Sequence, residues 1–357
     1  MLFPNAGVEV HPALLLLLGG MVGNLSGFFG VGGGFLITGG LLVFGVPPVF
    51  AVGTGLTLIM GSSLINTLKH RRVGNVDFKL GALMVIGTIP ALFAAERLNS
   101  HLEEVGIAGP VIRYVYVAFL GTLGSFLLYD FLRTRHAAEE GDPTATSLLA
   151  GRVRRLRVPP HSIGIPGLFS IPTYVSLSVP GMERVSLWVL VLIGSGVGFL
   201  AGLLGAGGGF ILMPILIYVL GVPTTVAIGT DLFQVIITGS VGTLLYALSN
   251  HVDLLMAVMM LAAASVGSQL GVAATRFVEP SRIRVLYGAT VLSGAVAVGL
   301  RQASGAGPDF LAGAASILLL TFAGAICVVI AALFVAEWSR QERTRSAMYR
   351  KKPREEG

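Results

Sequence analysis

The stretch GFFGVGGGF at residues 27–35 occurs a second time as GLLGAGGGF at residues 202–210. Glycine destabilises a helix by about 1 kcal/mol relative to alanine. A glycine cluster that occurs twice, each time inside a long apolar stretch, therefore requires a structural reason. Three adjacent glycines cannot share one helix face, so they predict a turn followed by a new half-helix. We expect that half-helix to begin at about Gly34 in the first copy and at about Gly209 in the second.

The composition around these clusters is that of an integral membrane protein. Hydrophobic residues make up 54% of the 357 residues and charged residues 12%, whereas roughly 25% of the residues of a typical soluble domain are charged. Apolar runs long enough to cross a hydrocarbon core of about 30 Å recur along the chain. Because a backbone in lipid must satisfy its own hydrogen bonds, we expect an all-α polytopic membrane protein.

The net charge of +6 is concentrated in two hydrophilic segments. Fourteen of the 24 Lys and Arg residues lie at 133–184 and 340–354. Basic segments next to membrane spans are typical of cytoplasmic loops, and this distribution disfavours a nucleic-acid-binding surface. We expect the inner cell membrane as the location, with the C-terminus cytoplasmic and the N-terminus outside. The single cysteine, Cys327, excludes a disulfide framework and a multi-cysteine metal site; no metal or cofactor is expected.

The spacing of the glycines indicates an internal repeat. The glycines within 19–30 recur within 194–205, at a constant offset of 175 (205 − 30). GVP at 45–47 and AVGT at 51–54 recur as GVP at 221–223 and AIGT at 227–230, at an offset of 176 (221 − 45). In the first copy the loop after the first full span is basic. In the second copy the loop after the second full span is basic instead. The positive-inside tendency therefore predicts two repeats of inverted topology.

Each repeat is expected to contain a glycine-broken hairpin and three transmembrane helices. The expected full spans are 50–68, 78–95 and 110–132 in the first repeat, 224–249, 254–275 and 283–300 in the second, and 310–336 after it. The expected organisation is a first membrane repeat at 1–132, a cytoplasmic Arg- and Pro-rich connection at 133–186, a second membrane repeat at 187–300, an extra C-terminal transmembrane helix at 301–337 and a basic cytoplasmic tail at 338–357.

The glycine segments must leave and re-enter the same side of the membrane for this topology to close. Residues 187–220 comprise 34 residues, and a helix of that length extends roughly 50 Å. That length is too long for one upright crossing and too short for two. A broken hairpin that turns at the glycines fits best, both here and at 12–45. The alternative is one steeply tilted helix, which would place the Arg-rich connection outside.

Two half-helices that begin inside the membrane predict an anion site. The first N–H groups of a helix lack partners, and its N-terminus carries roughly half a positive charge, so such ends bind anions. A pseudo-two-fold axis would bring the two ends together. The row of glycines before each turn has a second explanation, close packing of membrane helices. The expected substrate-binding residues are Gly32, Gly33, Gly34, Thr54, Gly207, Gly208, Gly209 and Thr230.

The sequence resembles the TauE/SafE sulfite exporters, also called the toluene sulfonate uptake permeases. GFFGVGGGF with GVPPVFAVGT (45–54) and GLLGAGGGF with GVPTTVAIGT (221–230) carry the resemblance, which extends from residue 19 to about residue 300. It implies a polytopic carrier that moves sulfite, sulfonates or related sulfur oxyanions, often outward. The second copy has the proline that usually follows the glycines, Pro214, whereas the first has Gly39. The two half-helices are therefore not expected to be equivalent.

Five further polar residues are candidates for the site, and three of them have two interpretations each. Asp231 lies inside an apolar span, where an ionised carboxylate is costly; we hypothesise that it binds the coupling proton or cation. Alternatively, it lies in a water-filled vestibule or pairs with Gln234 or a backbone N–H. Thr54 and Thr230 either donate hydroxyls to the anion or bond to the carbonyl groups of the preceding helical turn. Asn66 and Gln234 are candidates for the substrate path.

The predicted function is a secondary transporter that exports a small sulfur-containing oxyanion by ion-coupled alternating access. An anion channel, or a permease for another small carboxylate or anion, shares the architecture and is the alternative. A membrane-embedded enzyme is disfavoured, because it would need a catalytic constellation and the interior offers one ionisable residue, Asp231. The expected partners are a small anionic substrate, membrane lipid and a coupling proton or cation, with a homodimer left open.

Overall fold

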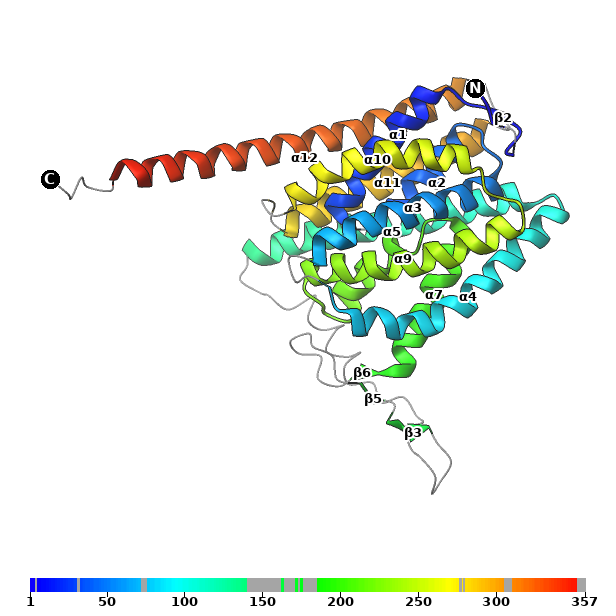
Figure 1. Ribbon diagram of the computed structural model, residues 1–357, viewed down its shortest axis with the longest axis horizontal. Coiled ribbons are helices and arrows are strands. Elements are labelled where there is room, and N and C mark those ends of the chain that lie inside the picture. The colour runs from blue at the N-terminus through cyan, green and yellow to red at the C-terminus, as the bar shows by residue number, and fades with distance from the viewer. Residues whose placement is uncertain are drawn as a thin grey trace.

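The computed structural model describes residues 1–3, 5–30, 33–71, 76–139, 162–163, 171–172, 174–175, 185–275, 278, 280–304 and 310–351. Three parts of the predicted scheme lie outside the described residues: Gly32, most of the connection at 133–186, and the end of the basic tail at 352–357. Within the described ranges the chain is almost entirely helical, and helices from both halves lie side by side (Figure 1).

The two halves contain matching series of helices. The first consists of α1 (Pro12–Phe29), α2 (Gly34–Val43), α3 (Pro48–Arg71), α4 (Phe78–Glu104) and α5 (Ala108–Glu139). The second consists of α7 (Leu187–Leu204), α8 (Gly209–Pro214), the π-helix η1 (Ile215–Val219), α9 (Thr224–Leu248), α10 (Leu254–Ala274) and α11 (Pro280–Ser304), and α12 (Phe310–Lys351) follows it. Three antiparallel strand pairs join β1 (Leu2–Phe3) with β2 (Val8–Glu9), β3 (Ser162–Ile163) with β4 (Ile171–Pro172), and β5 (Tyr174–Val175) with β6 (Val185–Ser186).

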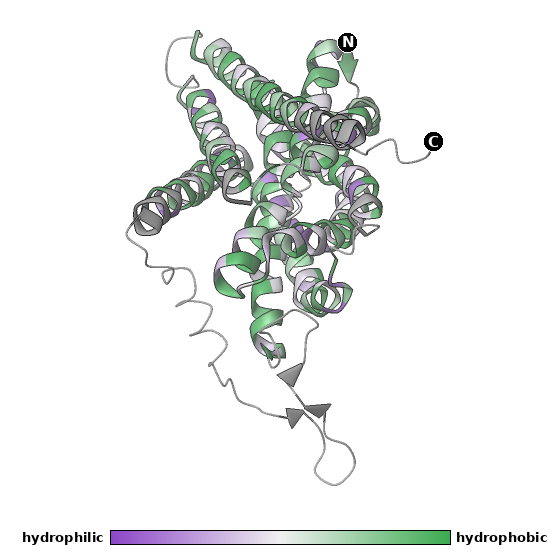
Figure 2. Ribbon diagram, turned by 90° about the vertical axis from the view of Figure 1, so that its left-hand side faces the viewer, coloured by the Kyte–Doolittle hydropathy of each residue, from purple (hydrophilic) through white to green (hydrophobic). Residues whose placement is uncertain are grey.

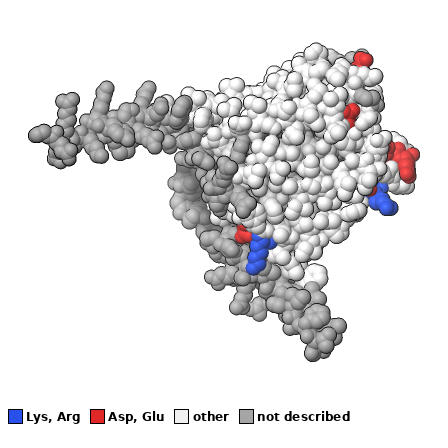
Figure 3. Space-filling model, in the orientation of Figure 1, with Lys and Arg blue, Asp and Glu red and all other residues white. Residues whose placement is uncertain are grey.

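Nine of the described helices are long and apolar enough to cross a membrane. The two shorter apolar helices are α2 and the continuous segment Gly209–Val219, which follow the two glycine turns. Hydrophobic residues cover most of the length of these helices (Figure 2). On the face drawn in Figure 3, the visible Lys, Arg, Asp and Glu side chains lie toward its edges, and the middle of that face carries none. The prediction of an all-α polytopic membrane protein is confirmed.

The glycine segments form broken hairpins, as predicted. In the first segment α1 ends at Phe29 and α2 begins at Gly34. A Cβ built on Gly40 would lie 2.6 Å from the Leu18 side chain, and one on Gly33 would lie 3.2 Å from the Cβ of Ser26. Because residue numbers fall along α1 as they rise along α2, α2 runs back along α1. The alternative of one continuous tilted helix is wrong.

The row of glycines before each turn lets helices of different halves pack closely. A Cβ on Gly27 of α1 would lie 2.6 Å from the carbonyl oxygen of Ser268 on α10, and Gly23 abuts the backbone of Ala264. In the matching pair, a Cβ on Gly198 of α7 would lie 2.5 Å from the carbonyl oxygen of Thr88 on α4. Such distances leave no room for any side chain. The packing explanation for these glycines is therefore correct.

Corresponding helices of the two halves pack against each other in opposite directions. On α9, Gly242 lies against Leu56 of α3 and Gly239 lies against Met60, so residue numbers on α9 fall as they rise on α3. The same reversal holds between α5 and α11. An inverted-topology repeat requires this relation, whereas the orientation of the two halves in a bilayer stays a prediction.

The expected spans 78–95 and 110–132 leave a loop at 96–109. This prediction is wrong over most of that range, because α4 continues to Glu104. The carboxylate of Glu96 is buried and accepts hydrogen bonds from two serine hydroxyls. These bonds offset the cost of burying the charge, so the residue does not end the helix. Asp77 and Asp253 are also buried. The interior therefore holds more ionisable groups than Asp231 alone.

Candidate functional site

Each glycine turn joins two helices through backbone conformations that only glycine adopts readily. Gly30 ends α1 at φ 74°, and Gly33 precedes α2 at φ 73°. In the second half Gly205 ends α7 at φ 67° and Gly208 precedes α8 at φ 81°. A residue with a Cβ is strained in this left-handed region. The local sequence therefore determines where each helix stops and where the next begins.

The two turns lie next to each other. A Cβ on Gly34 would lie 2.5 Å from the carbonyl carbon of Ala206, in the second turn. Ile59 of α3 contacts both turns, because its side chain lies against Gly34 and within 3.0 Å of a Cβ built on Gly207. Ile59 is the twelfth of the 24 residues of α3. The paired turns are therefore at mid-length of a helix long enough to span a membrane.

The N-termini of both half-helices keep unpaired N–H groups. The Leu36 N–H donates to Gly33 over 3.1 Å, and the Ile211 N–H donates to Gly208 over 3.0 Å. The two N–H groups before each of these have no acceptor among the described residues, namely those of Gly34, Phe35, Gly209 and Phe210. In the part of the chain that the structure describes, no Lys or Arg is buried. The local positive potential therefore comes from backbone dipoles.

Two tyrosines fix the half-helices, and Pro214 explains why they do so differently. Pro214 has no N–H, so the carbonyl of Phe210 loses its usual partner four residues on. The Tyr287 hydroxyl of α11 donates to that carbonyl over 2.5 Å. In the first half Gly39 replaces the proline, and its N–H donates to the Tyr116 hydroxyl over 3.2 Å. The helix after Pro214 continues as the π-helix η1, whereas α2 is regular throughout. The expected inequivalence of the half-helices is confirmed.

Asp231 lies between the two turns. It shares one face of α9 with Ile228 and Val235, three residues before and four after it. Ile228 abuts Gly30 of the first turn, and a Cβ on Gly207 of the second would lie 3.1 Å from Val235. The Asp231 side chain is fully buried, and neither carboxylate oxygen has a hydrogen-bond partner among the described residues. Pairing of Asp231 with Gln234 is not observed.

Asn66 and Gln234 are each held by the hydroxyl group of another side chain. Asn66 donates over 3.1 Å to the Ser26 hydroxyl, and Ser26 packs beside Gly33. Gln234 donates over 2.6 Å to the Thr88 hydroxyl. The side-chain oxygens of both residues, Oδ1 and Oε1, are buried without a partner. Asn66 is therefore held near the first turn and Gln234 against α4, and each leaves one polar atom without a partner among the described residues.

Thr54 and Thr230 have a structural contact that neither interpretation anticipated. The Thr54 hydroxyl accepts the backbone N–H of Asp253 over 3.0 Å, and the Thr230 hydroxyl accepts that of Asp77 over 2.9 Å. The two aspartates begin α10 and α4 as helix caps. The threonines thus tie α3 and α9 to the start of a helix in the other half. Each hydroxyl still has its proton to donate.

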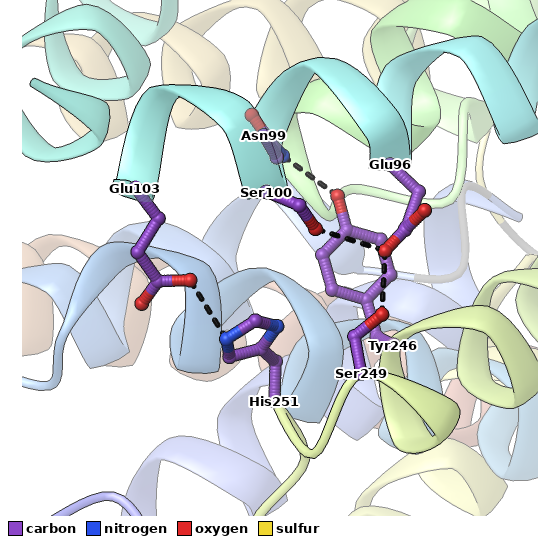
Figure 4. A network of polar contacts seen from close by, with 7 residues as sticks. All are labelled: Glu96, Asn99, Ser100, Glu103, Tyr246, Ser249 and His251. Carbon is purple, nitrogen blue, oxygen red and sulfur yellow. Dashed lines mark hydrogen bonds and ion pairs between the residues drawn. The ribbon is translucent and has the colours of Figure 1, made fainter. Parts of the chain in front are cut away.

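Two polar side chains drawn in Figure 4, Asn99 and Tyr246, hold the carboxyl end of α7 just before the second turn. Asn99 of α4 donates to the Leu203 carbonyl over 3.2 Å and to the Tyr246 hydroxyl over 2.6 Å. Tyr246 in turn donates to the Gly202 carbonyl over 3.0 Å. The last carbonyls of a helix need such partners. These bonds of Asn99 were not predicted from the sequence, because Asn99 was expected in a loop.

Other side chains drawn in Figure 4 join α4 to the connection between α9 and α10. Glu96 accepts from the Ser249 hydroxyl over 2.6 Å and from the Ser100 hydroxyl over 3.0 Å. His251 Nε2 lies 2.7 Å from a Glu103 carboxylate oxygen. These contacts close the bundle at the end where α4 finishes.

Comparison with known proteins identifies similar chains. The family described as Sulfite exporter TauE/SafE matches residues 15–300. The chain is 25% identical over 282 residues to the probable membrane transporter protein YunE of Bacillus subtilis (strain 168), covering 76% of this chain and 90% of that protein. It is also 25% identical over 288 residues to a probable membrane transporter protein of Methanocaldococcus jannaschii, with the same two coverages. No solved structure matches.

Proposed function

The chain belongs to the sulfite exporter TauE/SafE family, and on this premise we propose that it is a secondary transporter that exports a small sulfur-containing oxyanion, sulfite or an organosulfonate. Similarity to proteins named as probable membrane transporters supports transport as the function. The choice of a sulfur oxyanion rests on the family description.

One observation carries the proposed binding site: the two glycine turns adjoin at mid-length of α3, through Gly34 and Ala206. Four N–H groups of the two half-helices lack acceptors among the described residues. A small oxyanion has enough acceptor oxygens to use them, and two helix N-termini together offer roughly one positive charge. We assign the anion to Gly33 and Gly34 of one turn and Gly207, Gly208 and Gly209 of the other.

Gly32 is included among the proposed anion-binding residues because it directly precedes Gly33 in the first glycine cluster. Thr54 and Thr230 remain candidates for a weaker role, since each hydroxyl proton is free to reach an anion beside the turns. Asn66 and Gln234 are proposed to line the path to the site.

Asp231 is proposed to bind the coupling proton or cation. Its carboxylate has no partner among the described residues and lies between the two turns. An ionised carboxylate there would repel the anion, whereas a neutralised one would not. Proton or cation binding and anion binding are therefore expected to favour each other, which is the requirement for coupled transport.

Alternating access is proposed to involve movement of the two halves about the paired turns. The antiparallel packing of α3 with α9 and of α5 with α11 supports an inverted relation of the halves. At the end where α4 finishes, the contacts of Glu96 with Ser249 and of Glu103 with His251 would have to break for the site to open there. A homodimer stays an expectation.

Flux into proteoliposomes tests this function against the alternative of an anion channel or a permease for another anion. Uptake is measured for sulfite, sulfate, thiosulfate, a sulfonate and a small carboxylate, with and without a proton or sodium gradient. A carrier gives saturable flux that a gradient drives uphill. Flux that never saturates and never exceeds equilibrium would favour the channel, and a preference for the carboxylate would overturn the substrate class.

A further inference from the structure

Two arginines from different halves lie on contacting parts of α5 and α11, away from the glycine turns. Arg113 lies near the start of α5 and Arg301 in the last turn of α11. A Cβ on Gly109 would lie 3.4 Å from Nη2 of Arg113, and one on Gly45, just beyond the end of α2, would lie 3.1 Å from Nη2 of Arg301. The ten residues of α2 separate Gly45 from the turn at Gly33. The arginine pair is therefore about 15 Å from the proposed transport site.

Neither guanidinium group has a counter-ion in the described part of the chain. The ion pairs found there are His101–Glu104 and His251–Glu103. Arg301 directly precedes Gln302, which bonds to Arg113, so the two like charges lie on contacting parts of α5 and α11. Arg113 Nη1 donates over 3.0 Å to the Gln302 side-chain oxygen, but its buried Nε has no hydrogen-bond partner in the ranges that the structure describes. Half-buried like charges with an unused donor are costly unless a negative group binds them.

The corresponding positions at the other end of α5 and α11 do not have this excess of positive charge. Tyr116 and Tyr287, which bond to α2 and α8, relate α5 to α11 by an offset of 171 (287 − 116). At that offset, Arg301 corresponds to Asp130 of α5 (301 − 171). Arg113 corresponds to Arg284 of α11 (113 + 171). One end of the α5–α11 pair therefore has an arginine and an aspartate, Arg284 and Asp130. The other end has two arginines, Arg113 and Arg301.

We propose that Arg113, Arg301 and Gln302 form a second oxyanion site, at the end of the bundle where α5 begins and α11 finishes. Two guanidinium forks suit a sulfur oxyanion or a phosphate, because each binds two oxygens at once. The occupant is either the transported anion at the mouth of its path or the phosphate of a lipid headgroup. A purely structural role for Arg301 beside the end of α2 would require no anion.

Binding stoichiometry tests the proposal on the full chain. The purified protein in neutral phosphatidylcholine nanodiscs is dialysed against radiolabelled sulfite under anaerobic conditions at constant ionic strength. Two sites per chain are expected, and R301Q and R113Q should each lose one of them or weaken it about 10-fold or more. The matched control is R97Q. Arg97 is exposed in the last third of α4, and its replacement removes the same charge. R301K, which keeps the charge without the fork, should restore part of the binding.

A second arm uses nanodiscs that contain phosphatidylglycerol. If lipid phosphate is the occupant, sulfite binds only once in these discs, and the anionic lipid raises the unfolding temperature of the wild type but not of R301Q. D309N tests whether an acidic residue of the chain neutralises the pair instead. Equal destabilisation by D309N and R301Q, with no Arg-dependent response to sulfite or anionic lipid, would overturn the proposal. Loss of the site at the turns alone would leave the Arg-dependent site, so the two proposals fail separately.

Discussion

The Thr38 hydroxyl donates a 2.9 Å hydrogen bond to the carbonyl oxygen of Gly205, and this bond ties the first half-helix to the start of the second glycine turn. A Cβ on Gly55 would lie 2.6 Å from the same hydroxyl, so glycine at that position makes room for the contact. The two turns are therefore held together by a buried polar contact as well as by apolar packing.

Replacing Thr38 with valine should destabilise the protein by about 1–3 kcal/mol, because the Gly205 carbonyl stays buried without its donor. We expect a lower unfolding temperature and reduced anion flux. T38S keeps the hydroxyl and should retain most of both. Equal behaviour of T38V and T38S would show that the bond does not hold the turns together.

The two tyrosines offer a matched comparison. Y287F removes the donor to a carbonyl that Pro214 cannot serve, so a buried acceptor is left unpaired, at a cost of about 1–3 kcal/mol. Y116F removes only an extra acceptor for the Gly39 N–H, which keeps its helical partner. We expect thermal unfolding to show a clearly larger loss for Y287F. A larger loss for Y116F would contradict the role given to Pro214.

At the second turn, G208A should abolish or strongly reduce flux while the protein still inserts. Gly208 has φ 81°, and a Cβ there would lie 2.6 Å from the Val197 side chain. The left-handed conformation alone costs an L-residue about 1–2 kcal/mol. G196A is the control on the neighbouring helix, since nothing lies within 4 Å of a Cβ at Gly196. Undiminished flux in G208A would count against the site.

Repetition made part of this architecture predictable from the sequence. Gly34 and Gly209 begin half-helices as expected, because three adjacent glycines mark a turn wherever they occur in an apolar stretch. The inequivalence of the half-helices also follows from one local difference, Gly39 against Pro214. These features depend on residues close together in the chain.

Contacts between distant segments were not predictable in the same way. The bonds of Asn99 to Leu203 and of Glu96 to Ser249 join residues more than 100 positions apart. In the sequence, the charged residue Glu96 indicates the end of a membrane span, because its serine partners cannot be recognised there. Likewise, the matched pair Thr54 and Thr230 suggested ligand contacts, yet both accept N–H groups of capping aspartates. No periodicity in the sequence distinguishes these two uses of a threonine.

Asp231 provides a test of ion coupling. Because its carboxylate is fully buried and has no hydrogen-bond partner in the described part of the chain, D231N should not destabilise the fold and should raise the unfolding temperature if the carboxylate is ionised. We expect D231N to bind the anion but to lose accumulation driven by a proton or sodium gradient, measured in proteoliposomes. Gradient-driven uptake at the wild-type level would exclude the coupling role.

The orientation in the membrane is tested by cysteine accessibility. Among the described residues the Cys327 thiol makes one weak hydrogen bond, 3.7 Å from Sγ to the Met21 carbonyl oxygen, so C327S should give a stable cysteine-free background. His101 lies near the end of α4, and Ser339 lies on the part of α12 beyond its predicted span; both are exposed. In whole cells, a membrane-impermeant maleimide should label H101C from outside and S339C only after permeabilisation. The reverse pattern would invert the assignment of the two ends, because the basic segments would then lie outside, against the positive-inside tendency.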